Sequence, residues 1–165
     1  MIVQVRLDER LIHGQIAAAW VKTLPVDTLL VIDDTSATDP FLTKTLYMAS
    51  PANIKTFVMT NEEALKVLND PRCADRHIFV VVRTIDTLLN IAENAKDVKE
   101  INVSNYGRLV TSGKERKGYT DHLFLDDDEA VNLKKVLAFD IPAFMQMTPS
   151  QPKTPLTKDA SSVLP

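Results

Sequence analysis

Short apolar runs alternate with amphipathic stretches along most of the chain. The apolar runs are rich in Val, Ile and Leu and nearly continuous, which is typical of strands buried on both faces of a parallel sheet. Strands are expected at residues 1–7, 26–32, 53–58, 77–82, 98–103, 122–125 and 142–147.

The stretches between these runs place apolar side chains at helical spacing. Asp39 before Pro40 predicts an N-cap with proline at the first helical position, and Thr60 predicts a start resembling a capping box. Helices are expected within residues 16–21, 39–50, 60–69, 84–91 and 126–137. This alternation predicts an α/β fold: an open, mostly parallel twisted sheet of about six or seven strands with helices on both faces.

One domain, spanning residues 1–148, accounts for this pattern. The remaining segment, 149–165, contains four prolines and little apolar surface, so we expect a flexible tail or a linker remnant there.

Composition excludes several classes of function. A net charge of −3 gives no reason to expect nucleic acid as a partner, and the single Cys73 rules out an internal disulfide or a zinc site built on several cysteines. Neither glycine-rich nucleotide motif is present, and no apolar run is long enough for a membrane span. We therefore expect a cytoplasmic protein without a cofactor or metal, which reaches a membrane only through a partner.

The chemistry is concentrated in the stretch Arg6-Leu-Asp-Glu-Arg-Leu-Ile-His-Gly-Gln15, between the first strand and the first helix. A loop at this place, beside a helix N-terminus, favours an anion, and Arg6 and Arg10 add fixed positive charge. His13 titrates near neutrality and so has a lone pair available for nucleophilic attack. These residues indicate a histidine that accepts and passes on a phosphoryl group.

The same stretch, followed by Trp20, resembles the opening of the IIB components of the mannose/fructose/sorbose family of the bacterial phosphoenolpyruvate-dependent sugar phosphotransferase system. The resemblance implies a phosphotransferase in which His13 takes a phosphoryl group from a IIA phosphohistidine. It would pass that group to a sugar held by membrane IIC and IID subunits, with the protein peripherally associated with the inner face of the membrane. A homo-oligomer is left open.

Other polar residues are weaker candidates for the same site. Asp8 is expected to hold an arginine or one imidazole nitrogen, and Gln15 either contacts a phosphoryl oxygen or is an ordinary helix residue. Three further candidates follow later strands and should share the edge formed by the carboxyl ends of the strands: Asp34, Arg83 and Asn105.

Some readings compete with this one. His77 and His122 are expected to be structural or solvated, and the basic stretch 108–117 to be a solvated loop that an acidic partner surface could meet. A non-catalytic binding module for a phosphorylated metabolite would use the same anion site without a covalent step. A flavodoxin-like electron carrier is disfavoured by an aromatic content of only 6%.

Overall fold

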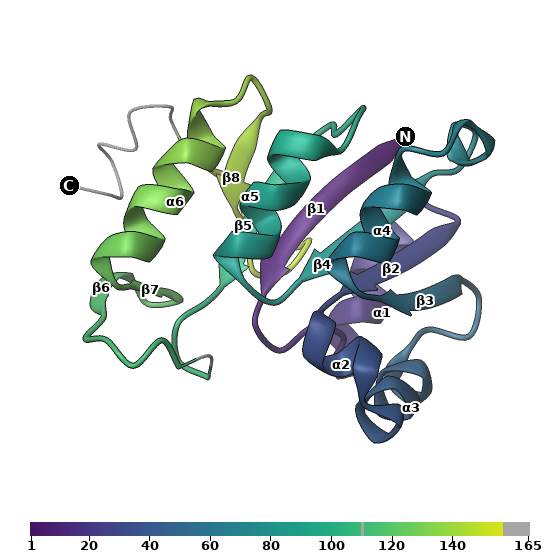
Figure 1. The fold of residues 1–165 in the computed structure, drawn as a ribbon, viewed down its shortest axis with the longest axis horizontal. Helices are drawn as coiled ribbons and strands as arrows, with labels where there is room; N and C mark the ends of the chain where they lie inside the picture. Colours follow the sequence, from purple (N-terminus) through teal and green to yellow (C-terminus); the bar gives the residue numbers. More distant parts are fainter. Residues whose placement is uncertain (110, 157–165) are drawn as a thin grey trace.

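A seven-stranded sheet forms the centre of the molecule, with strand order β3-β2-β4-β1-β5-β8-β9 (Figure 1). The computed structural model describes residues 1–109 and 111–156. Every strand pair in this sheet is parallel except β8 with β9. The strands are β1 (Ile2–Asp8), β2 (Thr28–Ile32), β3 (Lys55–Met59), β4 (Ile78–Val82), β5 (Ile101–Asn105), β8 (Ala143–Met145) and β9 (Thr154–Leu156). The predicted fold class is confirmed.

Helices cover both faces of this sheet. Side chains of α4, α5 and α6 share one buried cluster with the sheet, and side chains of α1 and α3 share the other. Figure 1 shows α4, α5 and α6 in front of the strands. The helices are α1 (Gly14–Thr23), α2 (Asp34–Thr38), α3 (Pro40–Ala49), α4 (Asn61–Leu68), η1 (Pro71–Cys73), α5 (Ile85–Asn94) and α6 (Asp127–Ala138).

The strands β2 and β4 are nearly all apolar and are covered on both sides, whereas the central strands β1 and β5 also bury polar side chains. Every residue of β2, β4 and β5 is buried. Side chains fix where the helices begin: Asp39 caps α3, and Thr60 forms a capping box with Glu63 at α4. Both helix starts were predicted from the sequence.

Two short elements depart from the expected strands and helices. The predicted strand near 122–125 is β7 (Leu123–Leu125), which pairs with β6 (Lys117–Thr120) in a separate two-stranded sheet and leaves the main sheet. The polar residues that follow β2 form the helical turn α2. Its N-cap residue, Asp33, accepts a hydrogen bond from the Ser36 N–H. Both elements are short enough for tertiary contacts to decide their structure.

The expectation of a flexible tail from residue 149 is wrong for its described part. Residues Thr154–Leu156 form β9 and pair with β8, and Leu156 is buried in the core. Lys153 pairs with Glu100 at 2.9 Å and lies over the Phe144 ring. The edge strand β8 offers unpaired backbone groups, and this segment satisfies them. The rest of the predicted tail, 157–165, lies outside the described residues.

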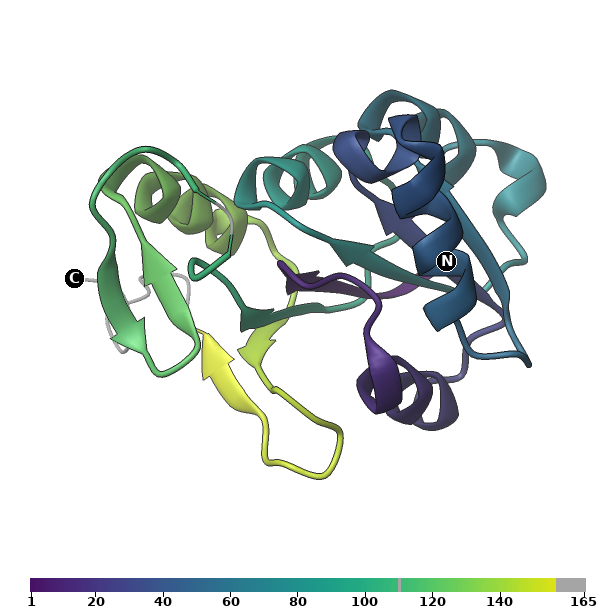
Figure 2. The ribbon, with the colours of Figure 1, turned by 90° about the horizontal axis from the view of Figure 1, so that it is seen from below.

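The central strand β1 directs its C-terminal end toward the loop that carries the candidate histidine. In Figure 2, which looks along the sheet from below, this loop leads from β1 into α1. The segment joining β8 to β9 extends on the same side of the sheet as α1 (Figure 2). The loop of His13 and the segment joining β8 to β9, which are far apart in the sequence, therefore lie on the same side of the sheet.

Candidate functional site

The loop between β1 and α1 is anchored by two apolar side chains. Leu11 and Ile12 are both 4% exposed and belong to the core cluster beneath α1. Leu11 has a φ of 58°, which is uncommon for a residue other than glycine and marks a backbone held by its surroundings. Gly14 has a φ of 45°, where a side chain would be strained. The loop is thus a fixed structure that presents His13 at the start of α1.

His13 has two uncommitted ring nitrogens. It occupies the N-cap position of α1 and its side chain makes no capping hydrogen bond. Both ring nitrogens are buried without a well-aligned hydrogen bond to the described residues, and the Leu11 backbone lies close enough to act on the ring. Burial, followed by the positive charge of Arg10, lowers the pKa of the His13 imidazole below its ordinary value. A neutral imidazole with an available lone pair is favoured at neutral pH.

Asp8 lies beneath the loop and holds both arginines. Its carboxylate is fully buried and accepts hydrogen bonds from Arg6 Nη2 at 3.0 Å, Arg10 Nε at 2.9 Å and Arg10 Nη2 at 3.0 Å. The Arg10 backbone N–H also donates to it at 3.2 Å. Of the two roles considered for Asp8, the structure shows the one in which it holds arginine.

Arg6 is enclosed within the protein. Its Nη1 donates to the Gln146 carbonyl at 3.1 Å, its Nη2 donates to the Met147 carbonyl at 3.0 Å, and its guanidinium lies 5.1 Å from the centre of the Trp20 ring. Burial lowers the pKa of Arg6 to about 10, so the group remains charged at neutral pH. Arg6 therefore joins Asp8 to the segment that follows β8.

Arg10 is the more accessible arginine, with 30% of its side chain exposed. Its Nε and Nη2 are bonded to Asp8, and Nη2 also lies 3.4 Å from the Met147 sulfur. Its Nη1 makes no hydrogen bond within the described part of the chain, which leaves this donor for an anion beside His13.

Glu9 connects the loop to the segment that follows β5. Its buried carboxylate accepts the backbone N–H groups of Gly107 at 3.1 Å, Arg108 at 3.0 Å and Leu109 at 2.8 Å. Asn105 Nδ2 contributes a fourth donor at 3.4 Å, and the Asn105 carbonyl accepts from the Glu9 N–H. Asn105, a candidate from the sequence, thus reaches the loop through Glu9.

The remaining candidates lie elsewhere on the edge or make no contact. Asp34 accepts from the N–H of Asn61 at 2.7 Å and so supports the start of α4. Arg83 forms an ion pair with Asp33 at 3.2 Å. Gln15 is exposed on the first turn of α1. His77 is half exposed, with 49% of its side chain accessible, and His122 is exposed.

Sequence reasoning assigned no role to Glu9 or Met147. Glu9 stands inside the quoted stretch, but an acid in a polar loop gives no sign that it will be buried. Met147 was placed at the end of the last predicted strand, and nothing local connects it with Arg10. Only the tertiary structure identifies these two residues.

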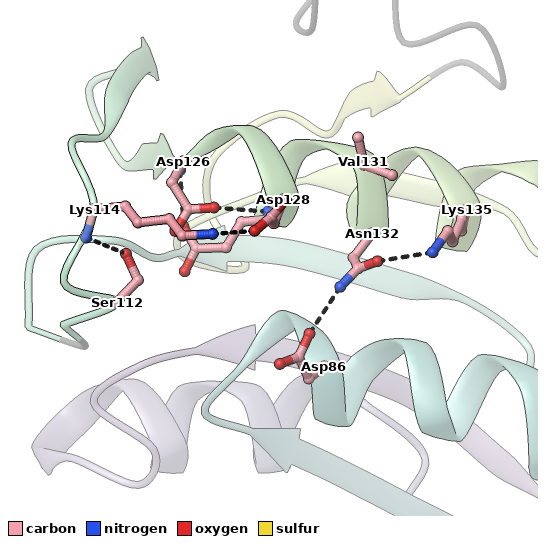
Figure 3. A pocket seen from close by; sticks show the side chains of 9 residues that line it. Asp86, Ser112, Lys114, Asp126, Asp128, Val131, Asn132 and Lys135 are labelled. Atoms are coloured by element: carbon pink, nitrogen blue, oxygen red, sulfur yellow. Dashed lines mark hydrogen bonds and ion pairs between the residues drawn. The ribbon is translucent and has the colours of Figure 1, made fainter.

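A separate cavity of about 520 Å³ lies between α5, α6 and the segment around Lys114 (Figure 3). Several of its polar groups are already engaged with one another: Lys114 pairs with Asp128, and Asn132 donates to Asp86 at 2.9 Å. Acidic side chains occupy the start of α6, so this helix end offers no place for an anion. We assign no chemistry to this cavity.

Comparison with known proteins adds independent information. Residues 2–158 match the family model described as the PTS system sorbose subfamily IIB component. A probable phosphotransferase enzyme IIB component of Streptococcus pyogenes is 35% identical over 160 residues, covering 96% of this chain and 98% of that protein. The N-acetylgalactosamine-specific phosphotransferase enzyme IIB component 2 of Escherichia coli is 31% identical, with 95% and 97% covered. The crystal structure of manxB from Thermoanaerobacter tengcongensis has a TM-score of 0.85 at 28% identity, covering 100% of this chain and 98% of that one.

Proposed function

This chain belongs to the sorbose subfamily of IIB components of the sugar phosphotransferase system, and on that premise we propose that His13 carries the phosphoryl group. The family assignment gives the chain a transferase role in sugar transport. The observation that supports His13 is its position at the start of α1, with unbonded ring nitrogens beside Arg10 and Asp8.

The proposed reaction has two displacements at phosphorus. In the first, a neutral His13 nitrogen attacks the phosphorus of a IIA phosphohistidine; the new N–P bond forms as the donor N–P bond breaks and its electron pair returns to the donor imidazole. The His13 ring loses the proton of its other nitrogen to water, and the donor imidazole takes up a proton, so that both rings end neutral. In the second, a sugar hydroxyl oxygen attacks the same phosphorus and the His13 N–P bond breaks. The hydroxyl proton passes to the freed imidazole nitrogen or to water.

The protein's part in both steps is to position groups and to balance charge. Arg10 Nη1 is the donor that we expect to bind the phosphoryl oxygens. Asp8 holds the Arg10 guanidinium through Nε and Nη2. Arg6 acts as a positioning residue because its two terminal nitrogens are bonded inside the protein. Both His13 ring nitrogens are buried, so the ring has to turn outward before it meets a phosphoryl donor.

The proposed partners are a IIA phosphocarrier and membrane IIC and IID subunits, which would bring the chain to the inner face of the membrane. Within the described residues, no helix has the length and apolar character to cross a bilayer.

Labelling tests the proposal directly. Incubation with phosphoenolpyruvate, the general phosphotransfer proteins and a IIA should add one phosphoryl group to the intact mass. The label should be labile in acid and stable in alkali, as an N–P bond is. His13→Ala should abolish it, while His77→Ala and His122→Ala retain it. Labelling that persists in His13→Ala would refute the assignment.

A further inference from the structure

The two edge strands of the main sheet differ in how they are protected. β9 forms one edge and carries Pro155, which has no N–H to offer to another strand. β3 forms the other edge, at the far end of the sheet from β8 (Figure 1). It contains no proline, its register with β2 has no bulge, and its one charged side chain is Lys55 at the first position. An edge of this kind is open to pairing with another strand.

Alternate residues of β3 direct their backbone groups away from β2. The Lys55 N–H donates to the Asp27 carbonyl at 3.4 Å, so Lys55 and every second residue after it face β2. The N–H and C=O groups of Thr56 and Val58 therefore point outward. Among the described residues β3 pairs with β2 alone, which leaves two donors and two acceptors at this edge without a strand to bind.

The face of this edge that lies toward α4 is apolar. Phe57 is 41% exposed, and together with Met59, Val67 and Cys73 it lines a cavity of about 220 Å³. On the other face of the strand, Thr56 is hydrogen-bonded to the Ser50 hydroxyl. A second apolar surface placed against Phe57 would remove its ring from water.

We propose that β3 pairs with β3 of a second copy of this chain, antiparallel and across a two-fold axis at Phe57. In that register Thr56 of each copy lies opposite Val58 of the other, and these residues exchange four N–H···O=C hydrogen bonds. Phe57 lies opposite the Phe57 of the second copy, and Lys55 lies opposite Met59. All the outward backbone groups of Thr56 and Val58 are then satisfied.

The symmetry of the edge favours a second copy as the partner. The two outward positions, Thr56 and Val58, are equally spaced about Phe57, so the strand matches its own sequence without a shift in register. The two copies of Lys55 lie at opposite ends of the paired strands. No like charges are therefore brought together, and the centre of the contact is aromatic.

The dimer leaves both candidate sites accessible. β2 and β4 separate β3 from β1, and the loop of His13 follows the C-terminal end of β1. Because the paired strands run antiparallel, the two loops of His13 lie at opposite edges of the joined sheet. Each copy can meet a phosphoryl donor independently, so association should not alter the transfer rate per chain.

Sedimentation equilibrium of the full chain measures the association. We expect the mass to rise with concentration from that of one chain toward that of two, with a dissociation constant on the order of 10–100 μM because the contact is small. Phe57→Lys places like charges directly opposite each other and should weaken association at least about tenfold. Val131→Lys, the same kind of change at a 52% exposed side chain of α6, is the matched control and should associate like the wild type.

Val58→Pro separates backbone pairing from side-chain contact. Proline removes the outward N–H of Val58, which no described residue accepts, and leaves Phe57 in place. The variant should stay folded, as thermal unfolding verifies, and should lose association as Phe57→Lys does. Association at wild-type strength in the folded variant would exclude pairing through this edge.

Cross-linking tests the register. In a Cys73→Ser background, Phe57→Cys places two thiols at a non-hydrogen-bonded pair, where Cα atoms are about 4.5 Å apart and within disulfide range. Oxidised glutathione should convert this variant to a covalent dimer and be reduced to two thiols in the process. Lys55→Cys in the same background is the control, because its counterpart in the dimer is Met59, and it should not cross-link.

Several results would overturn the proposal. They are a monomeric mass at every concentration up to about 1 mM, equal association by wild type and Phe57→Lys, or cross-linking of Lys55→Cys as readily as Phe57→Cys. Protection of the β3 amides only after a partner protein is added would also overturn it and would assign the edge to a strand of that partner. Phe57→Lys should accept a phosphoryl group on His13 at the wild-type rate, so a failure of the dimer and a failure of the phosphoryl site are separate observations.

Discussion

Asp8 is the residue on which the charges of the loop converge. A fully buried carboxylate is costly unless charged donors surround it, and here two guanidinium groups and one backbone N–H do so. Arg6 is bonded inside the protein, whereas Arg10 is partly exposed at the surface. The same carboxylate therefore holds the fold of the loop and aims the accessible arginine.

Arg10→Lys should slow phosphorylation of His13 by about tenfold or more, which corresponds to ~1.4 kcal/mol in the barrier. Lysine keeps the charge but cannot hold Asp8 with two nitrogens while offering a third to a phosphoryl oxygen. Single-turnover transfer from a phosphorylated IIA measures the rate, and the melting temperature measures folding.

Arg72→Lys is the matched control for this change. Arg72 binds Asp70 with Nε and Nη2 across the same sequence spacing, but on an exposed surface at the other end of the strands. Its loss should leave both transfer and the melting temperature close to those of the wild type, because water screens an exposed ion pair. Equal rates for wild type and Arg10→Lys would remove Arg10 from the site.

The lowered pKa of His13 predicts how transfer depends on pH. Since the proposed attack requires a neutral imidazole, the rate of phosphoryl acceptance should stay level as pH falls through the ordinary histidine value of 6.5, and decline only below it. The imidazole proton shifts of His13, assigned by difference from His13→Gln, should titrate over the same range.

Stability gives a second measurement of the same shift. The unfolded chain takes up a proton at His13 at a higher pH than the folded chain, so the free energy of unfolding should fall as pH drops below 6.5. His13→Gln should show a smaller fall between pH 7 and about pH 5.5 in urea titrations. A titration midpoint of His13 above 6.5 would contradict both parts.

At the residue level, sequence reasoning found what lies within one continuous stretch. His13, both arginines and Asp8 occur within eight positions, and their chemistry is legible there. Met147 also contacts Arg10, but it is 137 positions away in the sequence, and no local pattern predicts that contact. The buried role of Glu9 is equally invisible because its partners are backbone N–H groups, which every sequence contains.

At the level of elements, Glu9 fixes the segment between β5 and β6. Three consecutive N–H groups converge on one carboxylate, which places residues 107–109 beside the loop of His13. At the far end of this segment, Arg116 binds Glu129 with Nε at 2.9 Å and with Nη2 at 2.6 Å. The segment is thus held at both ends, and Leu109 is 65% exposed between them.

Glu9→Gln should lower the free energy of unfolding by about 1–3 kcal/mol. The new amide NH₂ would face N–H donors and leave at least one of them without an acceptor in the interior. Hydrogen exchange should accelerate at Gly107, Arg108 and Leu109 before it does so in β5. Denaturant unfolding together with exchange measures both effects.

The control for this change is Glu62→Gln on the exposed face of α4. Glu62 has a single ion pair, with Lys66 at 2.6 Å, and its side chain is 80% exposed. Its neutralisation should leave the free energy of unfolding nearly unchanged, because water screens this exposed pair. If Glu9→Gln were as mild as Glu62→Gln, the carboxylate would not be what holds residues 107–109.

Longer elements were predictable because their signals are local and redundant. The strands β2 and β4 were predicted from nearly continuous apolar runs, and α3 and α4 begin at recognisable caps. The elements α2, β6 and β9 have five, four and three residues, too few to show a period. Their structure depends on neighbours that only the fold supplies.

At the scale of the whole molecule, the C-terminal segment belongs to both the sheet and the site. β9 covers the edge of β8, and the segment between them supplies the carbonyls that bind Arg6. The four prolines of this segment led to the prediction of a flexible tail. Proline is common in such tails, but it is also tolerated in a strand at the edge of a sheet, where the missing N–H is not needed. Removing the chain from Gln151 should therefore destabilise the protein, contrary to what a flexible tail would predict.

Leu156→Ala is the most specific test of this arrangement. Leu156 is 7% exposed and packs in the cluster beneath α6, so its truncation should cost about 2–3 kcal/mol and lower the melting temperature by about 4–12 °C. Because β9 supports the segment that binds Arg6, phosphorylation of His13 should also slow in the folded variant. Leu109→Ala, the same change at a side chain that is 65% exposed, should leave the melting temperature within about 2 °C of wild type. Equal melting temperatures for the two variants would show that the packing of Leu156, and with it β9, contributes nothing to stability.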